Sequence, residues 1–167
     1  MNLMVCMQGD HAVLDWGAGA RRAAIGPGGI AIKGAEGDGI TPLGSWPVRE
    51  IFYRADRIAR PDVKLPLRAL QPSDGWCDAS EDAHYNRLVT LPYPASAESM
   101  WREDHLYDLL AVLGFNDDPV VPRAGSAIFL HLAKPDYANT HGCVALALDD
   151  ALAALEQLQP GDRVIIA

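Results

Sequence analysis

A thiol and an imidazole lie close together in the C-terminal part of the sequence. Cys143 follows His131, and Thr140, His141 and Gly142 come directly before the cysteine. Cysteine nucleophiles need a nearby base to take the thiol proton, and backbone N–H groups to hold the oxyanion that the attack creates. This segment offers all three, with Gly142 permitting a tight backbone turn. A buried, inert cysteine beside two surface histidines is the alternative that residue types alone leave open.

Regular elements must hold these groups in place. The apolar run 126–130 predicts a strand that ends at His131, and residues 133–141 form a polar loop. After the cysteine, Asp149 and Asp150 are candidate caps for a short helix whose apolar face is Leu152, Leu155 and Leu158. Residues 163–167 then form a closing strand.

The first 60 residues alternate short apolar runs with glycine-containing turns, which is typical of a β-meander. The expected strands are 3–7, 12–16, 21–25, 30–33 and 46–53. The proline-rich span 61–97 is expected to be a long ordered loop folded across the site, and 97–113 fits a helix or a buried strand equally well. We therefore predict one mainly β domain over residues 1–167, a sandwich or partly closed barrel with one short helix after the catalytic loop.

Composition excludes several classes of protein. The 167 residues carry a net charge of −8 with no block of Lys or Arg, which argues against nucleic acid or an anionic membrane surface as partner. Three cysteines at unrelated spacings predict neither a disulfide framework nor a metal site, and Cys6 is expected in the core. The N-terminal residues lack the pattern of a signal peptide, so we expect the cytoplasm, or the periplasm if a leader has been removed.

Thr140-His141-Gly142-Cys143, with His131 before it, resembles the [S/T]-H-G-C signature of the YkuD-type L,D-transpeptidase catalytic domain. Other segments resemble one branch of the same family, so the resemblance covers nearly the whole chain. These segments are 36–44, Gly75-Trp76, Tyr85-Asn86, 101–108, 114–116 and 125–129.

The resemblance implies that Cys143 forms a thioester with the acyl group of the substrate and that His131 is the general base and acid. A backbone carbonyl would orient the imidazole, and the amides of Gly142 and Cys143 would form the oxyanion hole. His141 would be a second imidazole at the site, with either a catalytic or a structural role. No metal or cofactor is implied.

The chain departs from the family pattern at Ala145, where an Arg or Asn is common, and the spacing from His131 to Thr140 is short. Arg102 is our candidate replacement, because a guanidinium can bind a substrate carboxylate bidentately. An ordinary ion pair of Arg102 with Glu98 or Asp104 is the alternative. Thr140, Tyr107 and Tyr85 are the other residues expected to contact substrate.

The implied substrates are peptidoglycan stem peptides or muropeptides. Attack by Cys143 at the bond between meso-diaminopimelate and D-alanine would release D-alanine. The expected compartment favours hydrolysis of the thioester, hence an L,D-carboxypeptidase of peptidoglycan recycling. The alternatives are an L,D-transpeptidase that cross-links stems or exchanges D-amino acids, and a non-catalytic binder of peptidoglycan fragments. A poised thiolate that is alkylated well below pH 8 is expected of the enzyme and not of the binder.

Overall fold

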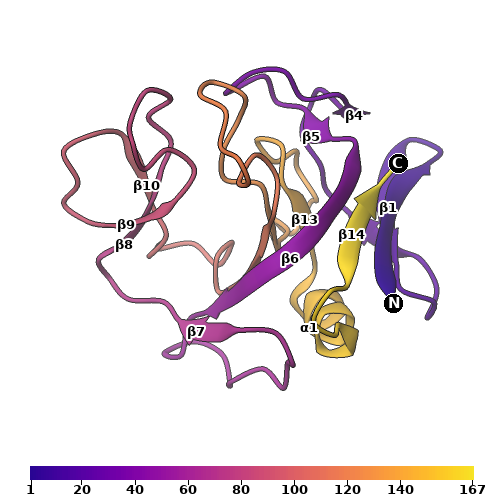
Figure 1. The fold of residues 1–167 in the computed structure, drawn as a ribbon. Coiled ribbons are helices and arrows are strands. Elements are labelled where there is room, and N and C mark those ends of the chain that lie inside the picture. Colours follow the sequence, from indigo (N-terminus) through magenta and orange to yellow (C-terminus); the bar gives the residue numbers. More distant parts are fainter.

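The computed structural model describes all residues from 1 to 167, and nine of its strands pair in one sheet that curls into a nearly closed barrel (Figure 1). The order is β13-β12-β11-β6-β14-β1-β2-β3, with β7 paired to β6. This confirms the predicted mainly β, barrel-like fold. The strands are β1 (Asn2–Gln8), β2 (His11–Asp15), β3 (Arg21–Ala23), β6 (Gly44–Tyr53), β7 (Leu67–Ala69), β11 (Leu109–Leu113), β12 (Phe129–Leu132), β13 (Val144–Leu146) and β14 (Arg163–Ile166).

The two edges of the large sheet meet beside the predicted nucleophile. Ala24, just after β3, and Ala145, in β13, form an antiparallel bridge with backbone hydrogen bonds of 2.8 and 2.9 Å. Pairing the edge groups satisfies backbone donors and acceptors that would otherwise be unpaired. The closure also fixes the backbone two residues after Cys143.

Each of the five predicted runs contains a strand, but the meander itself is confirmed only for β1, β2 and β3, which pair antiparallel in sequence order. The short strands β4 (Ile30–Ala31) and β5 (Thr41–Pro42) pair in parallel, and β6 pairs with β11 and β14. The prediction that Cys6 is in the core is wrong. Side chains alternate along β1, so Leu3 and Val5 point into the barrel while Met4 and Cys6 are exposed on its outside.

The prediction of a loop over residues 61–97 is also wrong. Besides β7, the span contains β8 (Asp74–Cys77), β9 (Leu88–Thr90) and the start of β10 (Ala97–Ser99). These three form a separate small sheet in the order β10-β8-β9, which lies beside the barrel in Figure 1. Strands of three or four residues carry too little periodicity to be distinguished from a proline-rich loop.

The leucine-rich segment that fitted a helix or a strand is the strand β11. All five of its residues are buried, because the strand lies between two hydrophobic clusters. Leu109, Ala111 and Leu113 belong to the barrel core, whereas Leu110 and Val112 pack toward the small sheet. Burial on both faces explains why the apolar pattern did not show a period of two.

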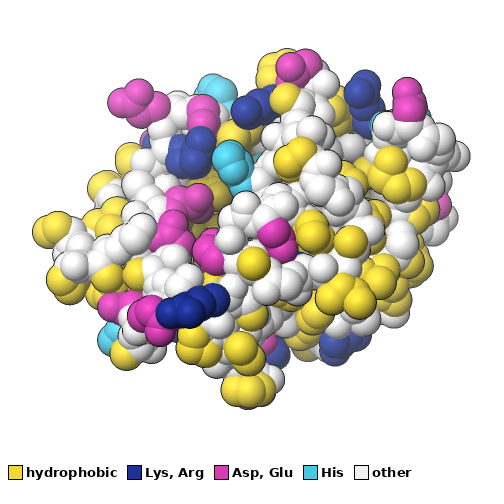
Figure 2. Space-filling view, turned by 90° about the horizontal axis from the view of Figure 1, so that it is seen from above, with side chains coloured by type: hydrophobic (Ala, Val, Ile, Leu, Met, Phe, Trp, Pro, Cys, Tyr) yellow, Lys and Arg dark blue, Asp and Glu magenta, His cyan; other side chains and the backbone are white.

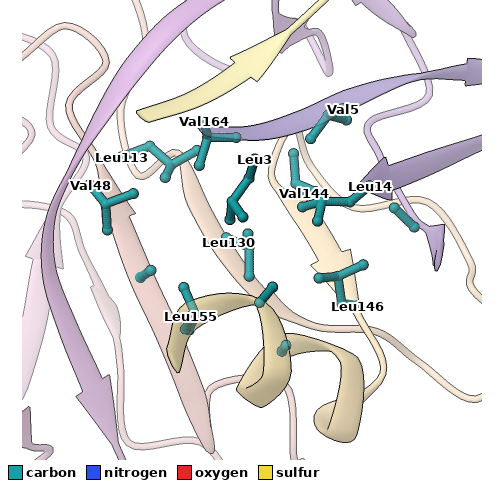
Figure 3. Close-up of a cluster of buried hydrophobic side chains, with 14 of the residues drawn as sticks. Leu3, Val5, Leu14, Val48, Leu113, Leu130, Val144, Leu146, Leu155 and Val164 are labelled. Atoms are coloured by element: carbon teal, nitrogen blue, oxygen red, sulfur yellow. The ribbon is translucent and has the colours of Figure 1, made fainter. Parts of the chain in front are cut away.

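The predicted helix is α1 (Leu148–Gln157), which lies below the barrel and sends Leu155 into the core (Figures 1 and 3). Asp149 and Asp150 are in its first turn, where their negative charges interact favourably with the helix dipole. They do not cap it: Ala147 is the N-cap, and no side chain makes the capping hydrogen bond. With ten residues in α1, the structure has no helix long and apolar enough to cross a membrane.

Candidate active site

Strands β12 and β13 place the predicted catalytic pair on the outside of the barrel. They run parallel, with Leu130 opposite Val144 and His131 opposite Ala145. Leu130 and Val144 point into the barrel core, so His131, one residue later, points to the opposite face. His131 lies inside β12 and not at its end as predicted. The second cluster of buried residues, which includes Phe129 and Cys143, occupies the outer face.

A cavity of about 390 Å³ contains both Cys143 and His131. The small sheet and the segment after it supply one wall, and the loop between β12 and β13 supplies another. Figure 2 shows acidic, basic and histidine side chains side by side around a recess on one face of the molecule. The charged side chains that line the cavity are Lys33, Glu36, Asp78, Glu98, Arg102, Asp104 and Lys134.

His131 is buried and held by its own strand. Its Nδ1 lies 2.9 Å from the carbonyl oxygen of Leu132, which can only accept, so Nδ1 carries the proton and Nε2 is the free base. Burial lowers the pKa of His131 to about 4. The imidazole is therefore neutral at physiological pH, and Leu132 supplies the orienting carbonyl that the family resemblance implied.

The Cys143 thiol is also neutral in the resting protein. Its Sγ donates to the carbonyl of Ala127 at 3.1 Å and accepts from the Phe129 N–H at 3.3 Å. Burial raises the pKa of Cys143 to about 12. This contradicts the expectation of a poised resting thiolate, so slow alkylation of Cys143 does not argue for a non-catalytic binder.

Thr140 and Gly142 fix the turn that presents the cysteine. The Thr140 hydroxyl accepts from the Gly142 N–H at 3.1 Å and donates to the Cys143 carbonyl at 2.6 Å. Gly142 has φ +130°, and a Cβ there would lie 2.8 Å from the carbonyl oxygen of Ile40. Because the Gly142 N–H is engaged by Thr140, the Cys143 N–H is the free donor of the two predicted for the oxyanion hole.

Arg102 lines the cavity, but its guanidinium is already held by an acid. Nε and Nη2 donate to the two carboxylate oxygens of Asp104 at 2.8 and 2.6 Å. The structure thus contains one of the two ion pairs named as the alternative. The guanidinium also lies 5.1 Å from the centre of the Tyr107 ring. Binding of a substrate carboxylate by Arg102 stays a prediction.

Tyr107 lines the cavity and contacts Glu98, an acid that the sequence analysis considered only as an ion-pair partner of Arg102. The Tyr107 ring packs 5.3 Å from the His131 ring, and its hydroxyl donates to Glu98 at 2.7 Å. Burial raises the pKa of Glu98. Glu98 and Asp78 reach the cavity from the small sheet and its flanking turn, and their sequence neighbourhoods contain no spacing that would have indicated a site.

The two remaining predicted residues occupy different places. His141 is exposed and lines the cavity. Tyr85 does not line it, and instead supports its wall by donating to the carboxylate of Glu36 and accepting from the Gly125 N–H at 3.0 Å.

Comparisons with known proteins agree with this arrangement. The family model described as the YkuD L,D-transpeptidase catalytic domain matches residues 1–166. No curated protein matches the chain in sequence. The match extends over the barrel, the small sheet and the cavity with its cysteine and histidine, and the chain therefore belongs to the YkuD family of L,D-transpeptidase catalytic domains.

Proposed function

We propose that this protein is an L,D-carboxypeptidase that removes D-alanine from the tetrapeptide stems of peptidoglycan fragments. The main observation behind the proposal is that the Cys143 thiol and a neutral His131 line the same cavity. His131 takes the thiol proton as Sγ attacks the carbonyl carbon of meso-diaminopimelate, and the Cys143 N–H donates to the developing oxyanion. The C–N bond then breaks, and His131 passes the proton to the amine of the departing D-alanine.

The second half of the reaction consumes one water molecule. His131, neutral again, takes a proton from water, whose oxygen attacks the thioester carbonyl. The C–S bond breaks, the proton returns to the sulfur, and the tripeptide leaves as a carboxylic acid. A depressed pKa of His131 supports this role, because the base regains its neutral form after each transfer.

The lining of the cavity supports a stem peptide as substrate. The free end of such a peptide carries carboxylate and ammonium groups, and the cavity presents side chains of both signs. Lys134 is an exposed cation in the lining without a salt bridge, while Glu98 and Asp78 are anions without one. A ligand with a carboxylate and an ammonium group can pair with Lys134 through the first and with Glu98 or Asp78 through the second.

Two observations support hydrolysis in recycling. A volume of about 390 Å³ is near the lower end for small-molecule sites, which suits one peptide end and water better than two peptides. An exposed thiol such as Cys6 persists most readily in a reducing compartment, which supports the cytoplasm.

Mass spectrometry of a disaccharide tetrapeptide incubated with the protein tests the proposal. We expect tripeptide and free D-alanine from the wild-type protein and none from Cys143→Ala. Parallel reactions contain an added D-amino acid or a second stem peptide. Exchanged or cross-linked products without tripeptide would establish a transpeptidase, and unchanged substrate that still binds would favour the non-catalytic binder.

A further inference from the structure

Ser126 is a buried polar side chain of the cavity wall that has no partner. The residue is 7% exposed, lines the cavity, and its Oγ makes no hydrogen bond within the protein. A buried hydroxyl without a partner costs about 1–3 kcal/mol, so proteins rarely keep one without a reason. The mechanism derived above does not use this hydroxyl.

The backbone around Ser126 is fixed by buried side chains. The Gly125 N–H donates to the Tyr85 hydroxyl at 3.0 Å, and the Ala127 N–H donates to the side-chain oxygen of Asn86 at 3.0 Å. Ala127 has φ +54°, a left-handed conformation that is unfavourable for alanine. The surrounding structure thus holds the backbone on both sides of Ser126 in one geometry.

The same segment touches the nucleophile. The Ala127 carbonyl accepts a hydrogen bond from the Cys143 thiol. Ser126 is therefore the sequence neighbour of the residue whose carbonyl positions Sγ before the reaction. Ser126 and Cys143 line the same cavity, so a peptide bound with its carbonyl carbon at Sγ shares that cavity with Ser126. The Ser126 Oγ is buried in its present position, so contact with a ligand requires a rotation about the Cα–Cβ bond to another staggered position.

We propose that Ser126 is a substrate-binding residue whose hydroxyl makes a hydrogen bond to the peptide backbone of the acyl donor beside the bond that Cys143 attacks. A hydroxyl can donate to a carbonyl or accept from an N–H, and a peptide unit offers both. The inference rests on the proposed function for the identity of the peptide. It adds a residue that determines how the stem is held, and it explains why an unpartnered hydroxyl is kept in the wall.

The test separates binding from folding. The tetrapeptide is titrated by calorimetry into Cys143→Ala and into Cys143→Ala with Ser126→Ala, and thermal unfolding is measured for both. Removing an unpartnered hydroxyl is neutral or stabilising, so we expect an unchanged or higher Tm together with a Kd raised about threefold to tenfold. In the active background, Ser126→Ala should lower kcat/KM by a similar factor, and Ser99→Ala, an exposed serine outside the cavity, should change neither value.

Other results overturn the inference. A Kd and kcat/KM within twofold of the parent would show that the hydroxyl does not contact the substrate. A lowered Tm with a matching loss of activity would show a structural role. Failure of the proposed function is distinguishable: a wild-type protein that releases no D-alanine refutes the carboxypeptidase, yet a serine-dependent Kd would still support the substrate contact. Both are refuted if the wild-type protein releases no D-alanine and the Cys143→Ala protein binds no tetrapeptide.

Discussion

The two faces of the β12–β13 pair differ in composition and in role. The face toward the barrel axis consists of branched aliphatic side chains, and the face toward the small sheet carries the thiol and the imidazole. The inner residues are Leu130, Leu132, Val144 and Leu146, and the outer ones are Phe129, His131, Cys143 and Ala145. Because neighbours on a strand alternate between faces, burying the aliphatic side chains also fixes the orientation of the predicted catalytic pair.

Stability and chemistry are thus separated between the two faces of a single strand. Loss of an inner side chain leaves a cavity in the core, while loss of an outer one removes a reacting group. Ala145 belongs to the outer set and also makes the bridge that closes the barrel. Its methyl group stands beside His131, where family members commonly carry a longer polar side chain.

The greatest loss of activity is expected from a substitution on the outer face. Cys143→Ala should lower kcat/KM by more than about a thousandfold, because no other group can form the thioester. The free energy of unfolding should change by no more than about 1 kcal/mol. Steady-state kinetics and urea denaturation measure the two quantities. Cys6→Ala, at an exposed position, is the control, and residual activity above one tenth would contradict the assignment of the nucleophile.

On the inner face, Leu130→Ala should lower the free energy of unfolding by about 2–5 kcal/mol, since Leu130 is fully buried. The folded fraction should keep kcat near the wild-type value. Denaturant titration gives the stability, with the exposed Met4→Ala expected within about 0.5 kcal/mol of wild type. A Leu130→Ala variant that stays stable but loses most of its kcat would contradict the assignment of stability to the inner face and chemistry to the outer face.

The third expected effect compares two thiols. At pH 8, iodoacetamide should modify Cys6 at least about tenfold faster than Cys143, because Cys6 is exposed and burial raises the pKa of Cys143 to about 12. Mass spectrometry of proteolytic peptides resolves the two sites, with Cys77 as a buried reference. Preferential labelling of Cys143 would indicate a resting thiolate.

The smallest expected effect is a shift of a pH profile. Protonated His131 cannot act as the base, and its pKa of about 4 places the acidic limb of kcat/KM near pH 4, below the ordinary histidine value of about 6.5.

The same pKa shift affects stability. The histidine of the unfolded chain binds this proton near pH 6.5, so the free energy of unfolding should fall as pH drops from about 6.5 to 4. Substituting His131→Gln should remove that contribution, whereas His11→Gln, outside the cavity, should retain it. An acidic limb near pH 6.5 would mean that water reaches the imidazole.

Much of the fold was predictable because the barrel strands carry local signals. Apolar runs separated by glycine turns identified five strands of the first 60 residues, β1 to β4 and β6, and leucine spacing identified α1. The small sheet was missed because its strands are very short and are stabilised by contacts outside the segment, such as Trp76 against Phe129 at 5.1 Å. Contacts between residues so far apart in sequence leave no periodic pattern.

The sequence alone was enough to single out Cys143 and His131 as the candidate nucleophile and base, because Thr140, His141, Gly142 and Cys143 form a contiguous motif that resembles the family signature. The surroundings of these two residues depend on the packing of distant segments. Burial makes the thiol and imidazole neutral, Glu98 reaches the cavity from another sheet, and Tyr85 supports the wall from behind. Ionisation and hydrogen bonding depend on distances between segments and on exclusion of water, and these exist only once the barrel and the small sheet have packed together.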